Sequence, residues 1–489
     1  MPIPTETTPL QARFTKGDLV EVDISDAAEV EKCFGRLDDG VAVFVRGTLA
    51  VGDRVRAEVY KIKTRFLEAR LVEVTAPAPC RVQPTCSHFG ICGGCKWQHV
   101  TYEEQLRIKH KQVADALAHL GGFEAVEVRD VLPAARQFGY RNKVDFSFSN
   151  KRFLLPEEID VPTEELAKPE DFALGFHAPQ RYAKAIDIDY CYLATPEMNR
   201  VLAAVRRFCL ERGLSVYSTR THEGFLRNLV VRQSEATAEV MVNLVTSSHD
   251  ATLMADLAKA LQEAVRSAPL TVVNNVTDRK NLVAFGDVEY VACGSGTITE
   301  KLGDLVFTIS PNSFFQTHTA QTVALYEEIR KAARLDPADL LYDLYCGTGS
   351  ISLTLAGACR QVVGIEVIES AISDARANAG HNHVDNVSFH SLDLKNLGPF
   401  LEEAGEEGRP DVVVTDPPRA GMHPKTIKTL RAVQPGRIIY VSCKPASLAR
   451  DAAALCEGGV YTLQTVQPVD MFPHTNHIES VAVLDSGAE

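Results

Sequence analysis

Several features are scarce or missing in this 489-residue sequence. No apolar run approaches the ~18 residues that a membrane-spanning helix needs, and the segment from Met1 to Asp18 lacks the apolar core of a signal peptide. There is no internal repeat and no low-complexity tract, and tryptophan occurs once, as Trp97. These absences argue against a membrane protein and a repeat array, and they predict a cytoplasmic protein with no membrane partner.

An excess of positive charge is also missing. The chain has 51 Lys and Arg against 64 Asp and Glu, for a net charge of −13, which taken alone argues against a nucleic-acid partner. The cations are uneven, however, because one stretch holds Arg54, Arg56, Lys61, Lys63, Arg65 and Arg70 with only Glu58 and Glu68 among them. Phosphate binding depends on local fields, so a basic face is one interpretation and a solvated strand face is the other.

The length predicts about three domains. Residues 1–75 show short β-rich runs punctuated by glycines, which is typical of a small barrel. Residues 76–309 mix helices and strands, including a charged helix over 102–120. Residues 310–489 alternate helices with buried apolar strands, which favours a parallel, doubly wound α/β sheet.

A glycine loop opens the last domain. The apolar strand Leu341–Leu344 runs into Gly347 and Gly349, and the next apolar strand ends in Glu366, which can accept hydrogen bonds from ribose hydroxyls. Asp393 ends a third strand and could meet an adenine amino group. The loop lacks the three-glycine dinucleotide pattern, so S-adenosylmethionine fits better than a dinucleotide. An ordinary tight turn with surface acids is the alternative. The predicted cofactor-binding residues here are Asp343, Tyr345, Gly347, Gly349, Glu366 and Asp393.

Three further residues suggest covalent chemistry on a pyrimidine. Asp416, in the sequence Asp-Pro-Pro-Arg, follows an apolar strand, and Cys443 follows the next one. Carbon C5 of uracil becomes nucleophilic once a thiolate adds to C6, and the C5 proton must later leave to a base. Cys443 and the late carboxylate Glu479 provide both groups. Arg419 stands where enzymes that methylate exocyclic amines have an aromatic residue, so amine methylation fits poorly.

The nucleophile needs help to ionise. A free thiol has a pKa of ~8.5, so some nearby group must favour the thiolate of Cys443. Arg419 and Lys444 are the candidate cations in the sequence. A buried cysteine that serves only as a small hydrophobe is the alternative for Cys443 by itself.

In combination, these motifs make the chain resemble the RNA uracil-5 methyltransferase family, in its iron–sulfur-containing 23S rRNA branch. The resemblance covers nearly the whole chain and includes Ser310–Gln316, Asp416–Arg419, Ser442–Pro445 and Phe472–Ser480. It implies a Rossmann-like class I methyltransferase domain at 310–489, a TRAM-like, OB-like RNA-binding barrel at 1–75 and a central α+β iron–sulfur domain at 76–309. It also implies that the helix over 102–120 packs on the catalytic domain.

The same resemblance implies roles for single residues. Cys443 is the nucleophile and Glu479 the base for the C5 proton. Asp416 holds or polarises the uracil site, and we count it with both the catalytic and the cofactor-binding residues. Gln316 contacts the cofactor or the target base.

A cysteine cluster stands apart from these motifs. Cys86, Cys92 and Cys95 are separated by five and two residues, a spacing that fits a metal cluster. The resemblance supplies Cys191 as a fourth ligand and thus a [4Fe–4S] cluster with a structural or RNA-shaping role. Cys80, five residues before Cys86, is the competing fourth ligand, for a tetrahedral zinc site.

The resemblance therefore implies S-adenosylmethionine-dependent formation of 5-methyluridine in 23S rRNA, on a base flipped out of its stack. Methylation of a transfer-RNA uridine or of cytosine C5 are sister hypotheses. A non-catalytic RNA-binding factor of ribosome assembly is the hypothesis from another class. RNA is the expected partner, and no protein partner is implied.

Overall fold

The computed structural model describes residues 9–27, 32–179, 181–265, 268–281 and 284–487. The chain forms two compact units, Met1–Ile108 with His474–Asn476, and Lys109–Pro473 with His477–Glu489. None of the helices within the described residues has both the length and the apolar character to cross a membrane. The three domain ranges given above stay predictions, because the two units cut the chain in a different way.

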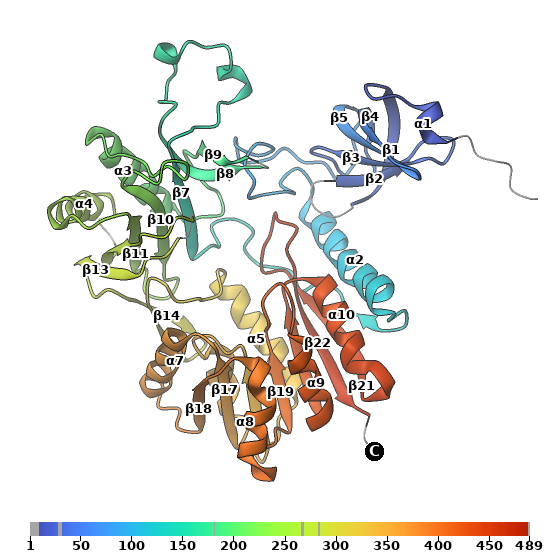
Figure 1. The fold of residues 1–489 in the computed structure, drawn as a ribbon, viewed down its shortest axis with the longest axis vertical. Helices are drawn as coiled ribbons and strands as arrows, with labels where there is room; N and C mark the ends of the chain where they lie inside the picture. Colours follow the sequence, from blue (N-terminus) through green and yellow to red (C-terminus); the bar gives the residue numbers. More distant parts are fainter. Residues whose placement is uncertain (1–8, 28–31, 180, 266–267, 282–283, 488–489) are drawn as a thin grey trace, which may run out of the picture. The chain divides into compact units, whose positions relative to one another are not determined.

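A barrel forms most of the first unit (Figure 1). Its strands alternate buried and exposed residues, as in β1, where Val20, Val22 and Ile24 point into the core. The strands close in the order β1-β2-β3-β5-β4. They are β1 (Leu19–Ala27), β2 (Lys32–Arg36), β3 (Ala42–Arg46), β4 (Arg54–Ile62) and β5 (Phe66–Ala76), after the short helix α1 (Leu10–Arg13). Helix α2 (Tyr102–Gly121) begins in this unit and ends in the second.

The second unit contains a central sheet with the strand order β13-β12-β11-β10-β7-β8-β9. Helices α3 (Pro196–Glu211) and α4 (Ala251–Ala264) pack on it, and Thr195 and Asp250 cap their N-termini. The strands are β7 (Lys143–Ser149), β8 (Ala173–Ala178), β9 (Arg181–Asp187), β10 (Leu226–Gln233), β11 (Val240–Thr246), β12 (Leu270–Val276) and β13 (Val288–Cys293). The hairpin β14 (Ile298–Leu302) and β15 (Leu305–Ile309) follows.

The C-terminal sheet has the order β18-β17-β16-β19-β20-β22-β21-β6. Neighbouring strands among β18, β17, β16, β19 and β20 are parallel. Strand β22 lies between β20 and β21 and is antiparallel to both. Its strands are β6 (Glu127–Val128), β16 (Leu340–Leu344), β17 (Gln361–Glu366), β18 (Val387–Ser391), β19 (Val412–Thr415), β20 (Arg437–Ser442), β21 (Tyr461–Val469) and β22 (Glu479–Ser486). The continuous burial of β16 and β19 is typical of parallel strands covered on both faces.

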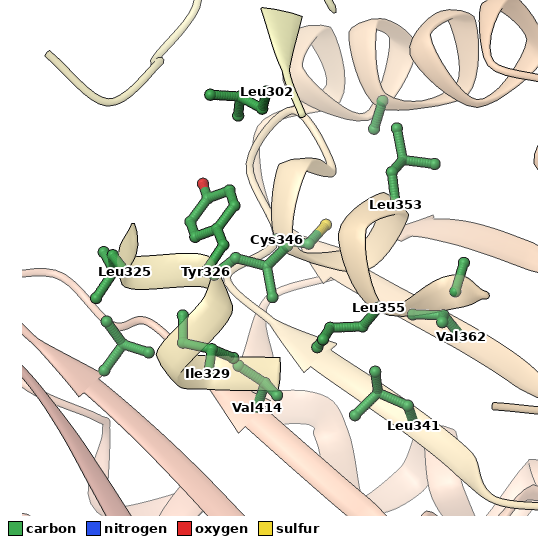
Figure 2. Close-up of a cluster of buried hydrophobic side chains, with 14 of the residues drawn as sticks. Leu302, Leu325, Tyr326, Ile329, Leu341, Cys346, Leu353, Leu355, Val362 and Val414 are labelled. Carbon is green, nitrogen blue, oxygen red and sulfur yellow. The ribbon is translucent and has the colours of Figure 1, made fainter. Parts of the chain in front are cut away.

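Helices cover both faces of the C-terminal sheet. Leu341 and Val414 point to the face where α5 and α6 pack, and the buried cluster there includes Tyr326 and Leu355 (Figure 2). Tyr342 points to the opposite face and meets Phe400 of α8. The helices are α5 (Thr319–Ala333), α6 (Ser350–Ala356), α7 (Glu369–His381), α8 (Leu397–Ala404), α9 (Pro424–Val433) and α10 (Pro445–Cys456). Short 3-10 helices lie at Pro156–Glu158, Thr163–Glu165, Leu394–Asn396, Glu406–Gly408 and Glu457–Gly459.

Candidate active site and cofactor site

The predicted reacting residues meet at one edge of the C-terminal sheet. Asp416 and Cys443 follow the carboxyl ends of β19 and β20, which are parallel neighbours. Glu479 is the first residue of β22, which runs the opposite way. Ser442 pairs with Ser480, so one further step along the same antiparallel register sets Cys443 opposite Glu479. Sheet topology thus brings together two residues that are far apart in the sequence.

Burial and mutual repulsion dominate the electrostatics of this trio. Burial raises the pKa of Asp416 to about 7, and the charge of Asp343 adds to the rise. The pKa of Glu479, which is 5% exposed, is raised well above its usual range, first by burial and then by Asp416. Burial, Glu479 and Asp416 together raise the pKa of Cys443 to about 11. A carboxyl with a raised pKa is a stronger base once ionised, which suits proton removal from carbon.

Two features oppose the rise in the pKa of the Cys443 thiol. Arg419 lowers the pKa of both Cys443 and Glu479, and its Nη2 lies 2.9 Å from His477 Nδ1. Cys443 also directly precedes Lys444, the N-cap of α10, where the helix dipole favours an anion. Of the two cations suggested by the sequence, Arg419 is the one that shifts the pKa of Cys443, whereas Lys444 is exposed.

Side chains of α10 form hydrogen bonds that hold the loop after Asp416. The Met422 amide donates to Asp451 Oδ2 at 2.7 Å, and Tyr440 donates its hydroxyl to the same oxygen at 2.7 Å. Arg450 Nη2 donates to the carbonyl of Ala420 at 2.6 Å, which holds the other side of the turn. Arg450 and Asp451 therefore fix the backbone that carries the Asp-Pro-Pro-Arg motif. No sequence signal separates these two residues from other charged positions of an amphipathic helix.

The glycine loop is open in a way that suits a cofactor. Tyr345, Gly347 and Gly349 all have positive φ, at 64°, 53° and 78°. A Cβ on Gly347 would meet nothing within 4 Å, so space is open beside the backbone there. Asp343 is fully buried and accepts from Ser352 Oγ through Oδ2, while its Oδ1 has no partner among the described residues. A buried oxygen without a partner beside an open glycine loop fits a polar ligand.

The acids predicted to bind the cofactor lie around this loop. Glu366 Oε1 accepts the amides of Val367 and Ile368 at 2.8 and 3.0 Å, which orients its carboxylate. The charge of Glu366 raises the pKa of Asp343, so these two acids are neighbours. Asp393 is exposed and caps a short helix by accepting from the Lys395 amide, which lowers its pKa.

Gln316 lies in the segment that precedes α5. It is 9% exposed, and its carbonyl accepts from Asn142 Nδ2 at 2.8 Å. This bond fastens the segment before α5 to the start of the central sheet. The neighbouring Phe314 is 66% exposed, which is unusual for a phenyl group and was not signalled as functional by the sequence.

The predicted metal ligands are divided between the units: Cys86, Cys92 and Cys95 belong to the first and Cys191 to the second. Within the described residues, no three His, Cys, Asp or Glu side chains are grouped so as to hold a metal ion. The four cysteine ligands stay a prediction. Two donors do point at sulfur, the Gly94 amide at 3.4 Å from Cys92 and Gln98 Nε2 at 3.1 Å from Cys95.

The competing ligand Cys80 has a packing role. Like Trp97, it packs against the buried cluster of Ala50, Ala78 and Val100, and its thiol is 3.7 Å from the carbonyl of Val51. Burial raises the pKa of Cys80, which disfavours the thiolate that a metal needs. The assignment of Cys191 as the fourth ligand stays a prediction.

The basic stretch of the barrel is partly neutralised. Arg56 pairs with Glu73 at 2.6 Å and Arg70 with Glu58 at 2.9 Å, and Arg54 lies 3.5 Å from Glu21. Lys61, Lys63 and Arg65 are the remaining cations of that stretch. Half of the stretch is therefore a solvated, paired strand face, and a basic phosphate-binding face stays a prediction.

The C-terminal part of the chain has the methyltransferase fold. It consists of a doubly wound sheet with a glycine loop at the edge where the candidate reacting residues meet. More narrowly, the chain belongs to the tRNA (uracil-5-)-methyltransferase family, whose model matches residues 234–486, and a TRAM domain matches residues 13–72. It is an S-adenosylmethionine-dependent RNA methyltransferase, and the five-stranded barrel is its TRAM domain.

Relatives match along nearly the whole chain. An uncharacterised RNA methyltransferase of Chlorobaculum tepidum is 53% identical over 98% of this chain and 99% of its own length. One of Porphyromonas gingivalis is 40% identical over 96% of this chain and its full length. The crystal structure of the Pyrococcus abyssi tRNA (uracil-54, C5)-methyltransferase with S-adenosyl-L-homocysteine is 30% identical, has a TM-score of 0.70, and covers 95% of this chain and 100% of that one.

Proposed function

We propose that this enzyme methylates C5 of a uridine in RNA through a covalent bond between Cys443 and the base. The observation that carries the proposal is the register of β20 and β22, which sets Cys443 opposite Glu479 with Asp416 beside them. A nucleophile, a base with a raised pKa and a polar group for the ring are the three parts that this chemistry requires.

Cys443 acts first and Glu479 acts after it. The Cys443 thiolate adds to C6, and the electron pair of the C5–C6 double bond moves towards C5 and O4. Bound S-adenosylmethionine supplies an electrophilic methyl group, so the new carbon–carbon bond forms at C5. Glu479 then takes the C5 proton, the double bond returns, and the sulfur of Cys443 leaves as thiolate. In balance, the bond between sulfur and methyl in S-adenosylmethionine breaks, S-adenosyl-L-homocysteine leaves, uridine gains one methyl group at C5, and the C5 proton passes to Glu479.

Asp416 and Arg419 have supporting roles in this scheme. Asp416, with a pKa near neutrality, can hold the uracil edge as either donor or acceptor. Arg419 favours the ionised forms of Cys443 and Glu479. The exposed ring of Phe314 offers a stacking surface for a base outside its helix.

For the cofactor, we propose Asp343, Tyr345, Gly347, Gly349, Glu366, Asp393, Gln316 and Asp416 as the binding residues. The open space at Gly347 and the unpartnered Oδ1 of Asp343 support this set. Isothermal titration with S-adenosyl-L-homocysteine tests it: Glu366→Gln is expected to weaken binding about tenfold, because one acceptor oxygen becomes a donor and the hydrogen bonds to ribose lose the charge of the carboxylate. Unchanged affinity would remove Glu366 from the site.

We propose 23S rRNA as the substrate, supported by the combination of a TRAM domain with the cysteine cluster. Transfer RNA is the second candidate, because the Pyrococcus abyssi structure that covers 95% of this chain is of a tRNA methyltransferase. Both RNAs from cells that lack this protein are incubated with methyl-labelled S-adenosylmethionine and wild type, Cys443→Ala or Glu479→Gln. Wild type is expected to form 5-methyluridine, and Cys443→Ala none.

Glu479→Gln gives the sharper result. It keeps the nucleophile but loses the base, so a methyl-labelled enzyme–RNA adduct that survives denaturant is expected to accumulate. Label in transfer RNA alone would move the substrate and keep the mechanism. Methylation by Cys443→Ala at the wild-type rate would reject the covalent mechanism.

We also propose a [4Fe–4S] cluster held by Cys86, Cys92, Cys95 and Cys191, with a structural role and no part in methyl transfer. The cysteine spacing and the two sulfur-directed hydrogen bonds support it. Iron and acid-labile sulfide are measured in anaerobically purified wild type, Cys191→Ser and Cys80→Ser. Iron lost from Cys191→Ser but kept in Cys80→Ser is expected, and zinc without iron would replace the cluster by a zinc site.

A further inference from the structure

Glu479 depends for its position on the connection between β21 and β22, residues 470–478, here called the base loop. Val469, the last residue of β21, pairs with Glu479, and the loop starts at the next residue, Asp470. Any shift at Asp470 therefore acts directly on the pairing that places Glu479. Met471 and Ile478 anchor the base loop in the apolar core, with Phe472 packed against the same cluster as Met471, and polar contacts hold its backbone in addition.

The strongest of these contacts comes from helix α2. Lys109 Nζ donates to Asp470 Oδ1 at 2.6 Å and to the carbonyl of Phe472 at 3.0 Å. The Phe472 amide donates to the same Asp470 oxygen at 3.0 Å. Both charged side chains are 0% exposed. A fully buried ion pair is a poor device for stability but holds its partners in one geometry.

The same helix holds the next part of the base loop. Gln105 lies one turn before Lys109, so the two side chains project from one face of α2. Gln105 Oε1 accepts the His474 amide at 2.8 Å, and its Nε2 lies 3.2 Å from His474 Nδ1. The carbonyl of His474 accepts the amides of Lys96 and Trp97 at 2.8 and 3.1 Å.

Two further residues hold the stretch between these points. Tyr140 donates its hydroxyl to the carbonyl of Pro473 at 3.1 Å. Its ring stacks on His318 at 4.5 Å, and His318 Nδ1 lies 3.3 Å from the carbonyl of Met471. Burial lowers the pKa of His318 to about 4, so the ring is neutral and can donate from Nδ1.

We propose that Lys109 is a positioning residue for C5 proton removal, because its buried pair with Asp470 fixes the base loop and through it Glu479. The inference rests on the proposed function, since it gives Glu479 the role of base. Lys109 touches no reacting atom in this scheme. Loss of Lys109 slows the last step of the reaction more than the first, because Cys443 is carried by β20 and not by the base loop.

The experiment follows the covalent adduct in the full-length protein. Wild type, Lys109→Met and Lys111→Met are mixed with the RNA that wild type methylates, and the denaturant-stable adduct is measured against released product. Lys111 is the matched control, a partly exposed lysine on the same helix that pairs with Asp115. Lys109→Met is expected to raise the ratio of adduct to product about tenfold or more, since a displaced general base loses part of its contribution. Lys111→Met is expected to keep the wild-type ratio.

A purely structural role predicts something else. Fewer molecules would fold, and adduct and product would fall together with their ratio unchanged. Folded Lys109→Met with the wild-type ratio overturns the proposal. If Lys109→Met does not fold, Tyr140→Phe decides, because it removes one hydrogen bond to the base loop and keeps every charge. A ratio raised about threefold supports the proposal, and the wild-type ratio overturns it.

Glu479→Gln separates this inference from the proposed function. Accumulated adduct in Glu479→Gln, together with an unchanged ratio in Lys109→Met or in Tyr140→Phe, rejects the positioning role alone. Absence of both methylation by wild type and adduct from Glu479→Gln rejects the covalent mechanism, and the positioning role falls with it.

Discussion

Single residues at the sheet edge carry charges that disfavour one another. Asp416, Glu479 and the thiolate of Cys443 cannot all be negative at low cost, because Asp416 raises the pKa of both other groups and Glu479 raises that of Cys443 in a buried place. In the resting site the raised pKa of Cys443, about 11, favours the neutral thiol, and the pKa of Glu479 is shifted upwards in the same direction. Addition to the uracil ring relieves this repulsion, since negative charge passes from the sulfur of Cys443 to the ring. Arg419 is the cation that limits the repulsion at rest.

Arg419→Gln tests this balance. Loss of the cation raises the pKa of Cys443 above about 11 and raises that of Glu479 further, so fewer molecules have an ionised nucleophile and base at neutral pH. The single-turnover methylation rate near pH 7 is expected to fall about tenfold. The rise of the rate with pH, roughly tenfold per unit while the thiol is mostly protonated, should move to higher pH. Arg419→Lys serves as the charge-preserving control, and an unmoved pH profile would contradict the role of Arg419.

Asp416→Asn separates electrostatics from binding. Removal of its charge lowers the pKa of Cys443, so alkylation of Cys443 by iodoacetamide at fixed pH is expected to become a few-fold faster. Methylation is expected to fall about tenfold or more all the same, because the contact with the uracil edge is lost. If methylation rises together with alkylation, Asp416 acts only through its charge and does not hold the base.

The secondary-structure elements show how far sequence reasoning reaches. The strand Leu340–Leu344 begins one residue before the predicted strand Leu341–Leu344, and strands end directly before Asp416 and Cys443, as the apolar runs there predict. The antiparallel entry of β22 between β20 and β21 was not predicted, since apolar alternation does not tell which neighbour a strand will choose. Cys443 and Glu479 were therefore recognised by chemistry and resemblance, whereas their register needed the structure.

The loop between β19 and α9 offers a test at this scale. Gly421 has a φ of +84°, and a Cβ there would lie 2.3 Å from Arg450 Nη2 and 2.4 Å from Asp451 Oδ2. Gly421→Ala is expected to lower the free energy of unfolding by about 1–3 kcal/mol and to reduce kcat, because the loop that carries Asp416 must shift. Denaturant titration and steady-state assays measure the two effects.

Gly357→Ala is the matched control for that substitution. Gly357 has a φ of −69° and open space around the position of a Cβ, so alanine fits without strain. It is expected to leave kcat unchanged and to stabilise by about 0.4–1 kcal/mol. Equal behaviour of the two alanine variants would contradict the role given to the Gly421 turn.

At the scale of the whole molecule, the two compact units are not continuous segments of the chain. His474–Asn476 belong to the first unit, although the residues on both sides belong to the second. Nothing in the local sequence signals this exchange, because the partners of His474 at Lys96, Trp97 and Gln105 lie far away along the chain. Domain ranges drawn as continuous blocks from composition cannot contain such a feature.

The pH dependence of stability is another property of the whole molecule, because it compares the folded with the unfolded chain. Asp343 is buried and its pKa is raised from 3.8 to about 7. Between these values the folded state keeps a proton that the unfolded state has lost. Its contribution to stability is therefore complete below the unfolded pKa and is lost as pH rises through about 7. Asp416, also raised to about 7, acts in the same direction.

The midpoint of thermal unfolding of the cofactor-free enzyme is therefore expected to fall between about pH 5 and about pH 8. Asp343→Asn removes the titrating group while an amide oxygen can still accept from Ser352 Oγ. Its midpoint is expected to fall less over the same range, so that the two curves converge at low pH and separate at high pH. Parallel curves would show that Asp343 is ionised in the folded protein throughout, which would contradict its burial as a neutral acid.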